Sequence, residues 1–403
     1  MVNSYSVVEN EPIEELLNRI LERGFATRPE GYRLIRADGS DLVAIMAAAA
    51  RLRDRSKGRH VSYSRNVFIP LTNMCRDKCA YCTFAKAPTS KEARTLSPED
   101  VLRIAEEGAR FGCKEALFSL GDKPELVHRR ARAELQRFGY RSTVEYLHAM
   151  AKMVVEDTGL LPHLNPGVLT YEQMAQLREV SASMGLMLES VSERLLAPGE
   201  AHFGCPDKVP SVRLRVLEDA GKLRIPFTTG ILIGIGETRE ERVDSLIAIA
   251  EIQRKHGHIQ EVIIQNFRAK PDIRFHGRPE PSLLEMLRTI AAARLILGAE
   301  MNIQAPPNLT PESYALYLFA GVNDWGGVSP VTDDHINPEA PWPKLDELEQ
   351  QTREAGFILQ ERLAIYPEYI IHEFVAPPMW QPILRQHEQL TSTVTQTHPA
   401  VLT

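Results

Sequence analysis

Three cysteines in one short loop carry the clearest chemistry in this sequence. Cys75, Cys79 and Cys82 have the spacing Cx3Cx2C and follow the apolar run 67–71. Three thiolates in one loop predict a metal site. A structural zinc site usually takes four protein ligands, and this loop contains no fourth cysteine or histidine. A 4Fe–4S cluster held by three cysteines keeps one iron free for a small molecule, so the ligand set favours such a cluster. A zinc site completed by a distant residue is the alternative.

A repeated unit of apolar run, polar loop and capped helix must position this loop. The expected strands cover residues 67–71, 116–120, 160–164, 186–188, 227–233, 262–264, 301–304 and, as the eighth, 320–323. Helix starts are marked between them, as at Ser97-Pro98 and at the capping box Thr238-x-x-Glu241. Continuously apolar strands are typical of a parallel sheet that is buried on both faces. The alternation predicts an α/β fold, a (β/α)8 TIM-type barrel, with a doubly wound sheet as the alternative.

Polar residues and glycines follow the expected strands. In a barrel these positions meet at the carboxyl-terminal rim, where active sites form. Besides the three cysteines, the ring is Gly121, Asp122, Asn165, Glu189, Gly234, Gln265, Asn266, Asn323 and Asp324. The turn Gly234-Ile235-Gly236 lacks the third glycine of a dinucleotide-binding fingerprint. Its glycines instead suit a close approach to a flat ligand or a tight turn.

Composition sets wider limits. The 403 residues are 43% hydrophobic and 25% charged, with a net charge of −6, which is ordinary for a soluble globular protein and argues against a broad nucleic-acid surface. Five cysteines, three of them in one motif, do not suit a secreted disulfide framework. No signal peptide or membrane-spanning run is read, so we expect a cytoplasmic protein without membrane contact. We expect an N-terminal helical extension over residues 1–60, a barrel over 61–375 and a partly disordered tail over 376–403.

The cysteine spacing, with Tyr81 just before the third cysteine, resembles the signature of the radical S-adenosylmethionine (radical SAM) enzymes. Longer segments resemble the family of 7,8-didemethyl-8-hydroxy-5-deazariboflavin synthases, specifically the subunit that closes the deazaflavin ring. These segments are 66–73, 118–125, 162–167, 228–238 and 321–327. The resemblance covers roughly residues 60–375. Superfamily members often carry Gly-Gly-Glu after the second strand, whereas this chain has Leu120-Gly121-Asp122, so a shorter carboxylate must reach the amino group of SAM.

This resemblance implies the cofactors and the reaction. One 4Fe–4S cluster would be held by Cys75, Cys79 and Cys82. SAM would be bound by Tyr81, Gly121, Asp122, Glu189, Ser190, Ile231, Gly234 and Gln265. A 5′-deoxyadenosyl radical would abstract hydrogen from 5-amino-5-(4-hydroxybenzyl)-6-(D-ribitylimino)-5,6-dihydrouracil, followed by ring closure and loss of ammonia. The partners implied are a tyrosine-coupling radical SAM subunit and an external reductant.

The rim positions that SAM does not occupy are candidates for substrate recognition. We hypothesise that Asn165, Asn266, Asn323 and Asp324 bind the substrate, with His163 and Asp324 as catalytic residues and His163 as a proton acceptor. Asn323 and Asp324 could instead shape a turn, and His163 could be a hydrogen-bonded core histidine. Two other functions compete: the tyrosine-coupling subunit itself, and a non-enzymatic iron–sulfur protein. Such carriers usually ligate each cluster with four cysteines.

Overall fold

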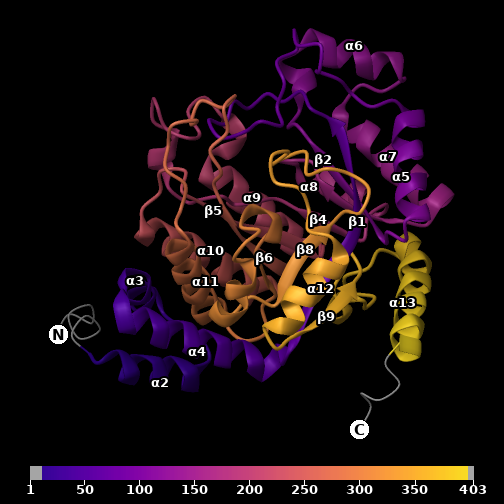
Figure 1. Ribbon diagram of the computed structural model, residues 1–403. Helices are drawn as coiled ribbons and strands as arrows, with labels where there is room; N and C mark the ends of the chain where they lie inside the picture. Colours follow the sequence, from indigo (N-terminus) through magenta and orange to yellow (C-terminus); the bar gives the residue numbers. More distant parts are fainter. Residues whose placement is uncertain (1–10, 398–403) are drawn as a thin grey trace.

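Eight parallel strands close into a barrel in the computed structural model, which describes residues 11–397 (Figure 1). The barrel strands are β1 His60–Thr72, β2 Glu115–Leu120, β3 Leu161–Asn165, β4 Ser183–Gly185, β5 Phe227–Ile233, β6 Ile259–Asn266, β7 Ile303–Gln304 and β8 Asp324–Val328. Each strand pairs with the next in sequence, and β8 and β2 both pair with β1. This closed ring confirms the predicted TIM-type barrel and rules out the open doubly wound sheet.

Strand β1 is long enough to have two partners along one edge. Its carboxyl-terminal half pairs with β2 from Asn66 onward, and its amino-terminal half pairs with a ninth strand, β9 (Ile358–Arg362). After β9 the chain crosses the amino-terminal end of the barrel. The carbonyl of Ala364 there accepts hydrogen bonds from Ser183, at the start of β4, and from Gln260, near the start of β6. This segment therefore closes the barrel at the end opposite the cysteine loop.

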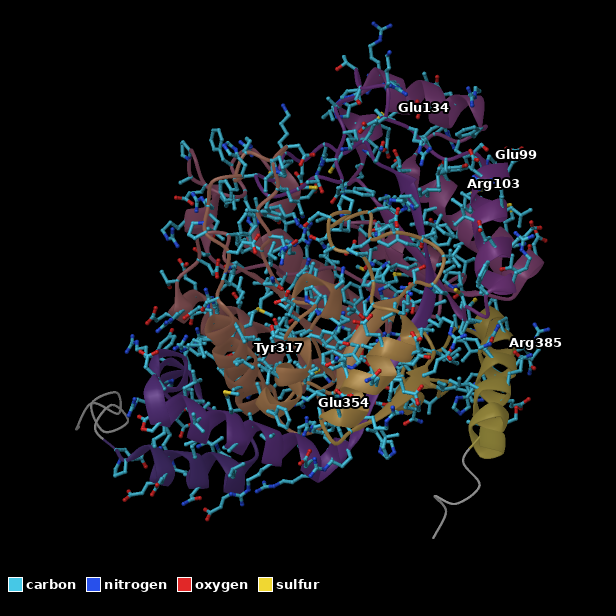
Figure 2. The ribbon with its side chains drawn as sticks, viewed as in Figure 1. Glu99, Arg103, Glu134, Tyr317, Glu354 and Arg385 are labelled. Atoms are coloured by element: carbon cyan, nitrogen blue, oxygen red, sulfur yellow. The ribbon has the colours of Figure 1, made fainter. Side chains whose placement is uncertain are left out.

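Helices cover the outside of the barrel. They are α5 Pro98–Arg110, α6 Arg129–Arg137, α7 Thr143–Thr158, α8 Tyr171–Arg178, α9 Pro210–Lys222, α10 Arg239–His256, α11 Leu283–Leu297 and α12 Leu345–Glu354. The predicted capping box at Thr238 is present at the start of α10, and Ser97 caps α5 by accepting a hydrogen bond from the Asp100 amide. Charged residues lie on the outer faces, as with Arg103 on α5 and Glu354 on α12 (Figure 2). No helix within residues 11–397 has the length and apolar character needed to cross a membrane.

Three helices precede the barrel: α2 Ile13–Arg23, α3 Arg28–Arg36 and α4 Gly39–Lys57. α4 packs against α11, and α3 packs against α10 and α11, so this layer lies outside the helices of one barrel side (Figure 1). The first ten residues of the expected extension lie outside the described chain. The divisions drawn at residues 60 and 375 remain predictions.

The tail that was expected to be partly disordered is helical over most of its length. Pro377–Thr397 forms helix α13. Met379 and Ile383 are buried in a second core with Leu161 and Tyr366, and the Gln386 amide donates to the carbonyl of Gly159 at 2.9 Å. A few apolar residues at helical spacing are enough to dock this segment. Residues 398–403 lie outside the described chain.

Two strand positions also differ from the prediction. The fourth strand was expected at 186–188 and lies at Ser183–Gly185. The eighth was expected at 320–323, but residues 314–320 form a 3-10 helix, and β8 begins at Asp324. Its sequence, Asp-Trp-Gly-Gly-Val, has weak strand propensity. The strand exists because β1 and β7 offer it backbone partners, which no local pattern reveals.

Candidate active site

A cavity of about 400 Å³ lies inside the barrel, with the cysteine loop among its walls. Eleven of the predicted site residues line it, from five different strands or the loops after them. They are Cys75, Cys79, Tyr81, Cys82, Gly121, Asp122, His163, Asn165, Glu189, Gln265 and Asn266. The barrel thus brings together side chains that are up to 191 positions apart in sequence, Cys75 and Asn266. Their roles stay predictions at this point.

The cysteine loop packs tightly against the end of β2. A Cβ atom on Gly121 would lie 2.0 Å from the carbonyl oxygen of Met74, so this contact requires glycine. The Sγ atom of Cys75 accepts hydrogen bonds from the backbone amides of Asp77, at 3.4 Å, and Asp122, at 3.2 Å. Amide hydrogen bonds to sulfur are one means by which proteins tune iron–sulfur clusters. Three thiols from one loop beside one cavity, with such donors in place, fit a three-cysteine cluster.

Cys205, one of the two cysteines outside the Cx3Cx2C motif, lies beside this loop. Its Sγ accepts a hydrogen bond from the amide of Lys78 at 3.3 Å. The Cys79 and Cys205 side chains are hydrogen-bonded to each other, and this bond is the main cause that raises the pKa of Cys205. Cys205 is buried and does not line the cavity. It contacts the cysteine loop on the side away from the cavity.

Asp122 lies at the cavity wall, and both oxygens of its carboxylate already have partners in the protein. One oxygen accepts a hydrogen bond from the amide of Val168 at 2.8 Å, and the other pairs with Lys123. Burial raises the pKa of Asp122 in spite of the opposing charge of Lys123. Asp77, Asp122 and Asp207 lie close enough together to share an ion, but Arg76 and Lys123 already pair with this group.

Glu189 carries a second buried carboxylate at the cavity wall. Its Oε1 atom lies 2.6 Å from the Nζ of Lys208. Burial alone would raise the pKa of Glu189, but Lys208 and Arg213 hold it below its ordinary value. The ammonium of Lys208 also lies 5.9 Å from the centre of the Tyr81 ring. An anion, a cation and an aromatic face together can bind a ligand that carries both charges and a planar ring.

His163 has a defined neutral form. Ser183 uses its only hydroxyl proton to donate to the carbonyl of Ala364 at 2.6 Å. The Nδ1 of His163 lies 2.7 Å from the same hydroxyl oxygen and must therefore be the donor to it. Burial lowers the pKa of His163. The imidazole is thus neutral with an unprotonated Nε2, which is the form that accepts a proton.

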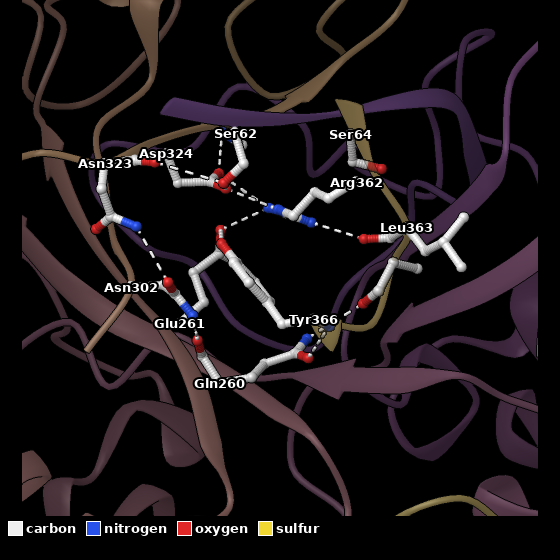
Figure 3. Close-up of polar contacts among 12 residues, drawn as sticks. Ser62, Ser64, Gln260, Glu261, Asn302, Asn323, Asp324, Arg362, Leu363 and Tyr366 are labelled. Carbon is white, nitrogen blue, oxygen red and sulfur yellow. Dashed lines mark hydrogen bonds and ion pairs between the residues drawn. The ribbon is translucent and has the colours of Figure 1, made fainter. Parts of the chain in front are cut away.

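A buried ion-pair network forms the floor of the cavity (Figure 3). The Arg362 guanidinium contacts both oxygens of Asp324, at 2.7 and 2.9 Å, and Oε1 of Glu261 at 2.8 Å. The hydroxyl of Tyr366 also donates to Glu261, at 3.0 Å. Burial raises the pKa of Glu261 to about 7. Arg362 and Glu261 line the cavity, and Asp324 lies behind them.

The predicted positions of Asn323 and Asp324 at the carboxyl-terminal rim were wrong. They come at the start of β8, and Asp324 lies in register with Ser62, ten residues before the end of β1 at Thr72. Asn323 accepts hydrogen bonds from Arg294 and from the amide of Ile303, outside the cavity. Because the eighth strand was placed too early in the sequence, residues at its beginning were taken to follow it. Asp324 instead pairs with Arg362, which lines the cavity.

Three predicted SAM contacts also lie outside the cavity lining. Ile231 is buried between Gly230 and Leu232, and Thr228 and Leu232 line the cavity; since side chains alternate along a strand, Ile231 points outward. The Ser190 hydroxyl accepts a hydrogen bond from the amide of Ser192. Gly234 donates to the Glu237 carboxylate at 2.8 Å, with a left-handed φ of 92° that makes a tight turn.

Sequence reasoning missed most of the polar residues deeper in the cavity. Among them are Asn66, Glu115, Gln260, Glu261, Gln304 and Arg362, which lie within strands instead of at the expected rim positions. Lys208, beside the cysteine loop, was missed as well. One signal was present: β1 places polar residues at every second position, Ser62, Ser64 and Asn66, which marks an inward face that is not purely apolar.

Comparisons with known proteins agree with this geometry. The sequence profile of the radical SAM superfamily matches residues 69–249. A protein of Methanopyrus kandleri named 7,8-didemethyl-8-hydroxy-5-deazariboflavin synthase is 54% identical over 77% of this chain and 92% of that protein. FO synthases of Streptomyces coelicolor and Mycobacterium tuberculosis H37Rv are 49% and 53% identical over 93% and 83% of this chain. The chain spans only 45% and 41% of their lengths.

Solved structures with low sequence identity share the fold. The FeFe-hydrogenase maturase HydG from Carboxydothermus hydrogenoformans superimposes with a TM-score of 0.70 at 18% identity, over 98% of this chain and 89% of that one. Methylornithine synthase superimposes with a TM-score of 0.68 at 18% identity, over 85% and 97% of the two chains.

Proposed function

We propose a function from the premise that this chain belongs to the radical SAM superfamily and, within it, to the 7,8-didemethyl-8-hydroxy-5-deazariboflavin synthases. The chain is proposed to catalyse the ring-closing half of that synthesis. Its substrate would be the tyrosine-derived adduct of ribityl-diaminouracil, and ammonia would be lost. The Methanopyrus kandleri protein supports this assignment because it carries the product's name and matches this chain over 92% of its own length.

One observation carries the proposal: the cavity has two chemically different ends. Beside the cysteine loop, Glu189 and Lys208 offer paired charges for SAM, which itself carries an ammonium and a carboxylate. Toward the floor, the lining is polar but mostly uncharged, apart from Glu115 and the Arg362–Glu261 pair. That deeper part suits a polar heterocycle with hydroxyl groups, whose hydrogen-bonding groups need fixed partners to offset desolvation.

When bound, a reduced 4Fe–4S cluster and SAM would supply a 5′-deoxyadenosyl radical. Cys75, Cys79 and Cys82 would hold the cluster, and Asp122 and Glu189 would orient the polar groups of SAM. The barrel walls exclude water from the reacting atoms, and the chain that follows β9 closes the far end.

His163 is proposed to accept a proton from the substrate as the new ring becomes aromatic. Its Nε2 is unprotonated in the neutral tautomer that Ser183 imposes, and the side chain lines the cavity. Asn165 and Asn266, also in the lining, are proposed to bind the substrate. An external reductant and a separate tyrosine-coupling subunit are the proposed functional partners.

Anaerobic turnover with the adduct tests the reaction directly. We expect 5′-deoxyadenosine and the deazaflavin to form together, both identified by mass spectrometry. Coupling of tyrosine to ribityl-diaminouracil by this chain, without ring closure of the adduct, would assign it to the other half of the synthesis. Absence of SAM cleavage by the reduced protein would support a carrier instead of an enzyme.

His163→Gln tests the proton acceptor. This variant should cleave SAM but form less deazaflavin per 5′-deoxyadenosine than the wild type. Ser183→Ala removes the acceptor for the Nδ1 proton and should lower the same ratio to a smaller extent. Wild-type ratios in both variants would exclude His163 from the proton transfer.

A further inference from the structure

Two asparagines in the cavity lining have buried polar atoms without partners. Neither the Nδ2 nor the Oδ1 of Asn66 has a hydrogen-bond partner among the described residues, and the same is true of the Oδ1 of Asn266. The two residues are 1% and 3% exposed, and both line the cavity. Buried amide groups in proteins are nearly always hydrogen-bonded. These atoms therefore point to a ligand that supplies the missing partners, in place of the water that can occupy the free site.

The neighbours of Asn66 leave its amide open to the cavity. On one side, Asn66 is in register with Glu115 of β2, whose carboxylate already accepts a hydrogen bond from Ser64. On the other side lies Gly327 of β8, where a Cβ atom would come within 2.1 Å of the Asn66 Nδ2. Glycine at 327 thus makes room for the amide and places no polar group against it.

The position of Asn66, far below the cysteine loop, favours the substrate over SAM as the ligand that pairs with its amide. Asn66 precedes the end of β1, Thr72, by six residues, which is about 20 Å of extended strand. SAM must reach the free iron of a cluster held by the loop that follows Thr72. A molecule bound below SAM is therefore the better partner for an amide at this depth.

We propose that Asn66 binds the pyrimidinedione ring of the substrate through the ring's imide edge, an inference that rests on the proposed function. An asparagine amide offers one donor and one acceptor side by side. Its Nδ2 donates to a ring carbonyl, and its Oδ1 accepts from the adjacent ring N3–H. The Oδ1 of Asn266 accepts from a hydroxyl of the ribityl chain. Asn66 thereby selects a ring with a free imide, because a ligand without it would leave the amide unpaired.

Equilibrium binding to the reconstituted, SAM-loaded protein tests this inference without turnover. The probes are 6-(D-ribitylamino)uracil and its N3-methyl derivative. We expect the wild type to bind the parent probe about tenfold more tightly than the methylated one, the value of roughly one good hydrogen bond. In Asn66→Ala, affinity for the parent should fall by about tenfold and the preference should disappear. Affinity for SAM should not change.

Further variants separate recognition from damage to the fold. Gly327→Ala should displace the amide and reduce the preference, whereas Gly277→Ala, where an added methyl meets no atom within 4 Å, should leave it intact. If Asn66→Ala loses its cluster, Asn66→Asp replaces it as the test. This variant keeps the acceptors but not the donor, and it should bind the parent probe more weakly than the wild type does.

Three outcomes would overturn the inference. If Asn66→Ala still prefers the parent probe to its N3-methyl derivative as strongly as the wild type does, another group recognises the imide. Weaker SAM binding with unchanged probe binding would assign Asn66 to the adenine of SAM. If the wild type makes deazaflavin from the adduct but does not distinguish the two probes, the inference fails while the proposed function stands; if it forms no deazaflavin, the proposed function itself fails.

Discussion

At the scale of single residues, Glu189 holds a strained backbone at the cavity wall. Its φ of 66° lies in the left-handed region, which costs a residue other than glycine on the order of 1–3 kcal/mol. Backbone hydrogen bonds to Gly230 and Leu232 of β5 hold it there. Strain of this kind clusters at ligand sites. We interpret it as the means by which the chain aims this carboxylate into the cavity.

Binding of SAM tests Glu189 and Asp122 together. Glu189→Ala and Asp122→Ala should each weaken SAM binding by about 1–3 kcal/mol, the value of a hydrogen bond to a charged group. The cluster should remain intact in both, as judged by iron content and absorbance. Glu354→Ala, on the outer face of α12 (Figure 2), is the control. Unchanged SAM affinity in both site variants would mean that the cofactor lies elsewhere in the cavity.

Iron content tests the three cysteines. Anaerobically reconstituted protein should bind about four irons and four sulfides, as expected for one cluster. Cys75→Ala, Cys79→Ala and Cys82→Ala should each abolish SAM cleavage. Cys113→Ala and Cys205→Ala should not. Cys205→Ala is the stricter control because its sulfur contacts Cys79, and loss of iron in this variant would make Cys205 a fourth ligand.

At the scale of elements, β1 joins the two ends of the site. Its inward face carries Ser62 at the floor, Asn66 in the middle and Phe68 nearer the mouth, and the cysteine loop follows its end. Two strands, β2 and β9, pair with different halves of the same edge of β1. A shift of β1 by one residue would move every one of these side chains to the other face. The register of this strand therefore sets both the floor and the mouth.

The cap of helix α10 tests whether this helix contributes only to stability or also to the shape of the site. The Thr238 hydroxyl accepts a hydrogen bond from the amide of Glu241 at the start of α10, within the capping box. Thr238→Ala should lower the free energy of unfolding by about 0.5–2 kcal/mol. Thr238→Ser, which keeps the hydroxyl, should lose much less. SAM affinity should be the same in both variants, and a change in Thr238→Ala alone would show that α10 shapes the site.

At the scale of the whole molecule, the barrel encloses charged side chains whose burial would destabilise the fold if they were unpaired. Arg362 faces two carboxylates, those of Asp324 and Glu261, and each of the three is at most 8% exposed at its side chain. Removing one partner from such a network leaves an uncompensated buried charge. The network joins β6, β8 and β9, so the floor of the cavity and the closure of the barrel depend on the same contacts.

The pH dependence of stability tests this network. Burial raises the pKa of Glu261 from 4.5 to about 7, so the folded protein prefers the neutral acid. A raised folded-state pKa contributes stability that is fully present below pH 4.5 and is lost as the pH rises toward 7. Glu261→Gln cannot ionise, so its free energy of unfolding relative to the wild type should increase between pH 5 and pH 8. Denaturant unfolding at these pH values measures the difference, and a difference that stays constant with pH would contradict the shifted pKa.

The sequence by itself determined the cysteine loop and the barrel. The Cx3Cx2C spacing, the alternation of apolar runs with capped helices, and the turn glycines are local signals, because they depend on neighbouring residues along the chain. They were enough to predict that eleven separated residues would line one cavity. The roles of those residues within the cavity remain predictions.

Only the tertiary structure decided which residues form the floor. Strand β8 has no local signal, and its pairing with β1 and β7 moved Asp324 from the expected rim to the buried network with Arg362. Asn66 lies in a strand that reads as buried, and its amide stands out only because Gly327, 261 positions later, places no side chain against it. Such contacts depend on strand register and on chain closure across the barrel, which pair residues by position in space and leave no pattern along the sequence.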